Sequence, residues 1–100
     1  MDPDLPDLLI ADVVVSTAGR DKDSLFYVLE TDGIWLSLVN GKDRTIDKPK
    51  RKKRKHTRRV LRSETGVAAK IRTGDKVLNS ELRGDLAVIS QQMQSIDLGG

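Results

Sequence analysis

The 100-residue chain has no cysteine, a single histidine and three aromatic side chains. Without cysteine it can form neither a disulfide nor a thiolate metal site, and this composition fits a reducing compartment. One histidine cannot supply a metal site that needs several, so a zinc centre has little basis. We therefore expect no metal and no other cofactor.

Long apolar runs are also missing. No stretch approaches the roughly 18 apolar residues that mark a membrane span. The N-terminus is acidic, with Asp2, Asp4 and Asp7, whereas a signal peptide begins basic and then turns apolar. These absences predict a cytoplasmic protein that has no membrane partner.

Side chains arranged for catalysis are equally scarce. No closely spaced carboxylates lie in an apolar setting that would raise a pKa for acid–base work. The serines lack the context of a nucleophile elbow, and no glycine-rich phosphate loop is present. We expect no enzymatic activity and no small-molecule substrate.

Positive charge is what the sequence has in excess, and it is concentrated in one place. Residues 42–62 contain 12 of the 18 Lys and Arg residues and only two carboxylates, while the rest of the chain is acidic. Like charges this close repel each other unless a polyanion or solvent screens them. A membrane surface would call for an interleaved apolar helical face, which is absent. The distribution favours an RNA or DNA backbone as the partner.

Two simpler interpretations of the basic run stay open. It could be a solvated loop, or a nuclear-targeting peptide, which the sequence Pro49-Lys50-Arg51-Lys52-Lys53-Arg54-Lys55 also resembles. We favour phosphate contact, because eight cations within positions 50–59 exceed what solubility requires. His56, inside the run, is expected to be a polar residue of a basic strand that can contact a phosphate.

Short β-branched runs separated by turn residues predict a mainly β fold. Strands are expected at 10–16, 25–31, 34–39, 44–48 and 56–61, with hairpin turns at Asp32-Gly33 and Asn40-Gly41. Alternation places Ile34, Leu36 and Leu38 on one face and Trp35, Ser37 and Val39 on the other. About five short strands indicate a small barrel or curled sheet.

Beyond Arg62 the pattern turns helical. A weak helical period over 64–73 is closed by Gly74, and a second helix is expected from Ser80, capped by Asn79 or Ser80. We divide the chain into a flexible lead (1–9), a β domain (10–62) and a partly helical C-terminal segment (63–100). The apolar stripe of the second helix is expected to pack on the β domain rather than on a protein partner.

Two further features have alternative explanations. Gly19 could let the loop backbone approach a ligand, flanked by Arg20 and Lys22 as donors, or could form an ordinary turn. Trp35 is the best candidate for an exposed base-stacking ring, although core packing is the commoner fate of an aromatic side chain.

The order of these motifs resembles bacterial KOW-domain RNA-binding proteins, relatives of the KOW-type large-subunit ribosomal proteins of archaea and eukaryotes. The resemblance covers about residues 10–62. It is carried by a Val-rich strand, Ala18-Gly19-Arg20-Asp21-Lys22, Phe26-Tyr27-Val28-Leu29, Asp32-Gly33, Leu38-Val39-Asn40-Gly41, and Lys48-Pro49-Lys50 leading to His56. In this chain Asp23 stands where the family pattern places a second glycine, and Asp tolerates left-handed φ better than most residues.

The resemblance implies an SH3-like β-barrel that binds structured ribosomal RNA without catalysis and associates with the ribosome. The expected RNA-binding residues come from the loop and the basic run: Gly19, Arg20, Lys22, Lys50, Arg51, Lys52, Lys53, Arg54, Lys55, His56, Arg58 and Arg59. Two other functions stay open, namely a transcription-elongation accessory that contacts polymerase or nascent RNA, and a protein-interaction module. Oligomeric state is not predicted.

Overall fold

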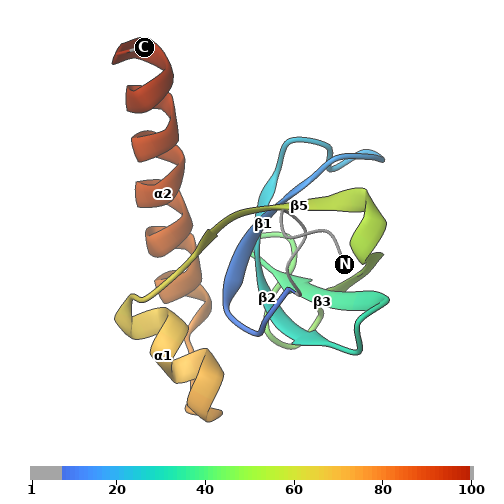
Figure 1. Cartoon of the computed structure of the whole chain (residues 1–100). Coiled ribbons are helices and arrows are strands. Elements are labelled where there is room, and N and C mark those ends of the chain that lie inside the picture. The colour runs from blue at the N-terminus through green and yellow to red at the C-terminus, as the bar shows by residue number, and fades with distance from the viewer. Residues whose placement is uncertain (1–7, 100) are drawn as a thin grey trace.

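The computed structural model describes residues 8–99 as one antiparallel sheet followed by two helices (Figure 1). The strands are β1 (Asp12–Ser16), β2 (Leu25–Thr31), β3 (Trp35–Val39), β4 (Lys50–Lys53) and β5 (Thr57–Arg62). A 3-10 turn, η1 (Arg54–His56), joins β4 to β5, and α1 (Gly66–Thr73) and α2 (Asn79–Gly99) follow. The predicted mainly β fold with a helical C-terminal segment is confirmed.

The strands lie in the order β4-β3-β2-β1-β5, so β4 and β5 are the two edges of the sheet. Only η1 separates these edges along the chain, and the sheet curls accordingly (Figure 1). Within the described residues no ladder joins β4 to β5. The sheet is therefore curled but not closed, which corrects the expectation of a barrel.

The predicted fourth strand at 44–48 is wrong, because the turn after β3 is larger than a two-residue hairpin. The Asn40 side chain accepts hydrogen bonds from the backbone N–H groups of Lys42 and Arg44, at 2.9 and 3.0 Å. A second turn follows, in which the N–H of Lys48 donates to the carbonyl of Thr45. The chain becomes extended only at Lys50, so the fourth strand is built from the basic run itself.

The β2–β3 turn also differs from the expected form. Gly33 has the positive φ of 95° that the Asp-Gly signal predicted, but Asp32 does not share it. Instead the Asp32 carboxylate accepts hydrogen bonds from the N–H groups of Ile34 and Trp35, which is an Asx turn. Ile34 consequently belongs to the turn and is 66% exposed, rather than sharing the buried face of Leu36.

The two faces of the sheet are covered by two separate apolar clusters. The inner cluster, inside the curl, consists of Leu8, Val14, Phe26, Val28, Leu36 and Leu38. The helical cluster, on the opposite face, joins Val13, Tyr27 and Val39 of three adjacent strands to residues of α1 and α2. Leu8 shows that the predicted lead is packed at its end; residues 1–7 lie outside the described residues.

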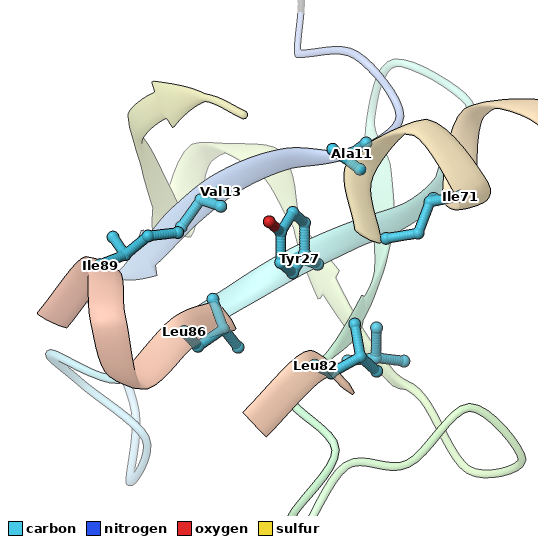
Figure 2. Packing of buried hydrophobic residues seen from close by; sticks show 9 residues of the cluster. Ala11, Val13, Tyr27, Ile71, Leu82, Leu86 and Ile89 are labelled. Atoms are coloured by element: carbon cyan, nitrogen blue, oxygen red, sulfur yellow. The ribbon is translucent and has the colours of Figure 1, made fainter. Parts of the chain in front are cut away.

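The C-terminal segment packs on the sheet, as expected. Leu82, Leu86 and Ile89 of α2 cover Tyr27 and Val13, and Figure 2 shows their side chains directed at the strands. The Tyr27 hydroxyl donates to the Asp85 carboxylate and lies 2.9 Å from the Ser63 hydroxyl. Burial, together with Asp85, raises the pKa of Tyr27. A buried polar contact therefore fixes α2 to β2 within an otherwise apolar interface.

Candidate nucleic-acid interface

The basic run forms β4, η1 and the start of β5 rather than a loop. Successive side chains on a strand point to opposite faces. Lys50 and Lys52 stand opposite two leucines of the inner cluster, whereas Arg51 and Lys53 take the other face. The alternation therefore divides one block of cations into two groups that have different surroundings.

Lys50 and Lys52 both bind Asp21, in the loop after β1. Their ammonium groups lie 2.8 Å from its two carboxylate oxygens, and Lys52 Nζ also donates to the carbonyl of Ala18 at 2.8 Å. Lys52 is only 8% exposed. Although partial burial opposes ionisation, the two lysines and the Ser16 hydroxyl hold the pKa of Asp21 well below its usual range. Two ammonium groups thus share one carboxylate, which neutralises one of the two lysine charges.

The same contact orders the β1–β2 loop. Gly19 and Asp23 both adopt left-handed φ, 87° and 74°, and the N–H of Lys22 donates to the carbonyl of Gly19. Asp23 thus tolerates the conformation that was predicted for it. Arg20 and Lys22 are exposed, on either side of the anchored Asp21. The loop and the basic run, predicted to act together, are brought into direct contact.

A second carboxylate, that of Asp12 in β1, forms ion pairs with arginines of β5 at the C-terminal end of the basic segment. Asp12 is fully buried, and its oxygens lie 3.7 Å from Arg59 Nη1 and 3.1 Å from Arg62 Nε. It also accepts a hydrogen bond from the N–H of Leu9 at 2.9 Å. Arg59 Nη1 is buried and has no hydrogen-bond partner in the described part of the chain. That nitrogen therefore depends on the charge of Asp12.

These contacts divide most of the cations of the β1–β2 loop and of residues 50–62 into two sets, which we name here. The paired set binds Asp21 or Asp12 and consists of Lys50, Lys52, Arg59 and Arg62. The exposed set consists of Arg20, Lys22, Arg51, Lys53, Lys55 and Arg58. Among residues 8–99, no carboxylate lies within ion-pair distance of the exposed set. Arg54 and His56 of η1 are half-buried and belong to neither set.

Trp35 lies on the face that carries Arg51 and Lys53. The ring is half-buried, with the Arg51 guanidinium carbon 4.7 Å and the Lys53 ammonium 5.4 Å from its centroid. An open pocket of about 310 Å³ adjoins it, lined in part by Glu30, Asp32 and Arg51. Neither apolar cluster includes Trp35. Core packing thus holds for Phe26 and Tyr27, whereas Trp35, the predicted candidate for an exposed ring, is partly accessible.

Residues 8–99 contain no group of three or more metal-ligating side chains, and no helix among them is long and apolar enough to span a membrane. No protein-family model matches the chain, and no curated protein is significantly similar to it.

Proposed function

We propose that this chain is a non-catalytic RNA-binding protein whose exposed set binds the phosphates of the RNA. The observation that carries the proposal is the separation of the cations. Asp21 and Asp12 contact the four cations of the paired set, whereas the six cations of the exposed set have no carboxylate within ion-pair distance among residues 8–99. Four of them lie between residues 51 and 58, and two lie on the loop that Asp21 anchors to β4.

The strand order supports the proposed SH3-like, KOW-type assignment. Five short antiparallel strands form one curled sheet in the order β4-β3-β2-β1-β5, which is compatible with a small SH3-like domain although the sheet is not closed. The left-handed φ of Asp23 is compatible with the position where the family pattern has glycine. The anchored loop would then present Arg20 and Lys22 where the KOW resemblance expects RNA contact.

Structured RNA is the proposed ligand because the exposed set is dispersed over a loop, a strand and a turn. Such a surface suits recognition by shape and phosphate position, whereas a single-strand reader needs several exposed aromatic rings. Phe26 and Tyr27 are buried, which leaves only Trp35 for stacking. From the KOW resemblance we further propose that the RNA is ribosomal and that the protein acts on the ribosome in the cytoplasm.

A salt titration with matched variants tests the proposal. Replacing Lys53, Lys55 and Arg58 together by Gln should lower the slope of log affinity for a folded RNA against log salt by about 2 units, since each phosphate contact contributes about 0.7–0.9. The control replaces three exposed lysines that lie outside the exposed set, Lys42, Lys48 and Lys76. Equal changes in the two variants would refute a defined phosphate surface.

A second experiment addresses the ribosomal assignment. The tagged protein should sediment with ribosomal particles at low salt and be released as the salt concentration rises. The Lys53, Lys55 and Arg58 variant should be released at a lower concentration than the control. Co-purification with RNA polymerase in place of ribosomes would contradict the ribosomal assignment while leaving RNA binding intact.

A further inference from the structure

The pocket beside Trp35 has properties that phosphate binding does not use. It lies over the outer face of β3 at the β2–β3 turn, and Trp35, Arg51 and the acidic residues Glu30 and Asp32 line it. Its volume of about 310 Å³ is near the lower end of small-ligand pockets, which span about 300–1,000 Å³. A site that combines an indole ring, a guanidinium and two carboxylates is unusual for a surface that only attracts a polyanion.

Trp35 and Arg51 together form a stacking surface. The Arg51 guanidinium is planar and its central carbon lies 4.7 Å from the ring centroid. The antiparallel pairing of β3 and β4 places Arg51 opposite Ser37, on the same face of the sheet as Trp35. Unpaired bases stack on aromatic rings and on arginine planes alike. Trp35 is the only tryptophan and is half-buried, so part of the ring is accessible.

The carboxylates select among the bases. Ionised carboxylates only accept hydrogen bonds. Guanine is the base whose Watson–Crick edge offers two adjacent donors, N1–H and the N2 amino group, which match the two oxygens of one carboxylate. Asp32 already uses one oxygen, Oδ1, on the N–H groups of Ile34 and Trp35. Glu30 is exposed, and among residues 8–99 neither of its carboxylate oxygens has a hydrogen-bond or ion-pair partner.

From these observations we infer that the pocket binds one unpaired guanine, which stacks against Trp35 and Arg51 and donates from its Watson–Crick edge to Glu30. Lys53, 5.4 Å from the ring centroid, is placed to meet a phosphate next to that base. The inference rests on the proposed RNA binding and deepens it: the exposed set holds a folded RNA, and the pocket reads one base in a loop or bulge.

Short RNAs of about five nucleotides provide the test, because they hold one central base and its neighbouring phosphates without forming a folded structure. The set is a uridine oligomer and three versions with a central G, A or C. We expect the G version alone to quench Trp35 fluorescence strongly and to bind about tenfold more tightly than the uridine oligomer. Equal binding of all four, or binding without a change in fluorescence, would overturn the inference.

Variants separate base reading from charge. Glu30→Gln should remove the preference for guanine, whereas Glu64→Gln, the same change at an exposed acid between β5 and α1, should keep it. Lys55→Gln should weaken all four RNAs equally. Retained preference in Glu30→Gln would refute the assigned reader.

Guanosine monophosphate serves as a further probe, since the same chemistry could bind a free nucleotide. We expect its affinity, measured by the quenching of Trp35 fluorescence, to be at least about tenfold lower than that of the G-containing RNA, because it lacks the neighbouring phosphates. Equal affinity would contradict a base-reading site in RNA. If salt-dependent binding of folded RNA persists while every guanine effect is absent, this inference fails and the proposed function stands.

Discussion

The paired and exposed sets come from the same stretch of sequence but have opposite surroundings. Lys52 and Lys53 are adjacent, yet one is 8% exposed and bound to Asp21 while the other is on the surface beside Trp35. Strand alternation produces this division. A run of basic residues therefore does not form one continuous surface. The net charge counted over the run is larger than the charge that a bound ligand would contact. We expect the paired set to stabilise the fold and the exposed set to bind RNA.

Removing the charge of Asp12 should have the largest effect on stability. Asp12→Asn keeps the size of the side chain but leaves Arg59 Nη1 buried without a compensating charge. Breaking a fully buried pair destabilises by about 3–5 kcal/mol, and the partial exposure of Arg59 reduces this to about 2–3 kcal/mol. Urea denaturation gives the free energy of unfolding, with the exposed Asp47→Asn as control. A loss below about 0.5 kcal/mol would show that the pair is dispensable.

Asp21→Asn should have a smaller effect that depends on pH. The pKa of Asp21 is depressed in the folded state, so its contribution is fully present above the unfolded pKa of about 4 and is lost as pH falls toward the folded value. We expect the variant to be about 1–2 kcal/mol less stable at pH 7, because an ion pair that is largely buried is lost.

Urea denaturation of both proteins between about pH 7 and pH 2.5 checks the sign of this effect. The difference in unfolding free energy should shrink in the acid part of the range, where Asp21 of the unfolded chain takes up a proton while the folded carboxylate stays ionised. A difference that stays constant with pH would mean that the carboxylate charge contributes nothing. A difference that grows toward low pH would contradict the depressed pKa.

The strands and helices were largely predictable because their signals are local. The β-branched residues of β1, the apolar run of β2 and Gly74 after α1 act through their own neighbours in sequence, and the structure agrees there. The fourth strand was not predictable from the Asn-Gly turn signal. That signal indicates a reversal of the chain, but the Asn40 side chain enlarges the turn through four further residues.

The candidate site was predictable in location but not in detail. The basic run and the Gly19 loop do meet, yet the pairing that divides the cations depends on contacts between distant residues. Asp21 is 29 positions before Lys50, and Asp12 is 50 before Arg62. One local signal indicates such a pairing: Asp12 directly precedes three valines, and a charge at the start of a buried strand needs a partner. The sequence predicted the exposure of Trp35 only from its residue type and its place in the alternation of β3. Its contacts with Arg51 and Lys53 depend on the pairing register of β3 and β4, which the sequence does not reveal.

Comparing Lys52→Gln with Lys53→Gln tests the central claim most directly, because the two substitutions remove the same charge from adjacent positions. Each variant is measured by urea denaturation and by salt-titrated RNA binding. Lys52→Gln should lower the free energy of unfolding by about 1 kcal/mol and leave the salt slope within about 0.3 of wild type. Lys53→Gln should leave stability within about 0.5 kcal/mol and lower the slope by about 0.7–0.9. Equal effects of the two substitutions on both measurements would contradict the division of the run into paired and exposed cations.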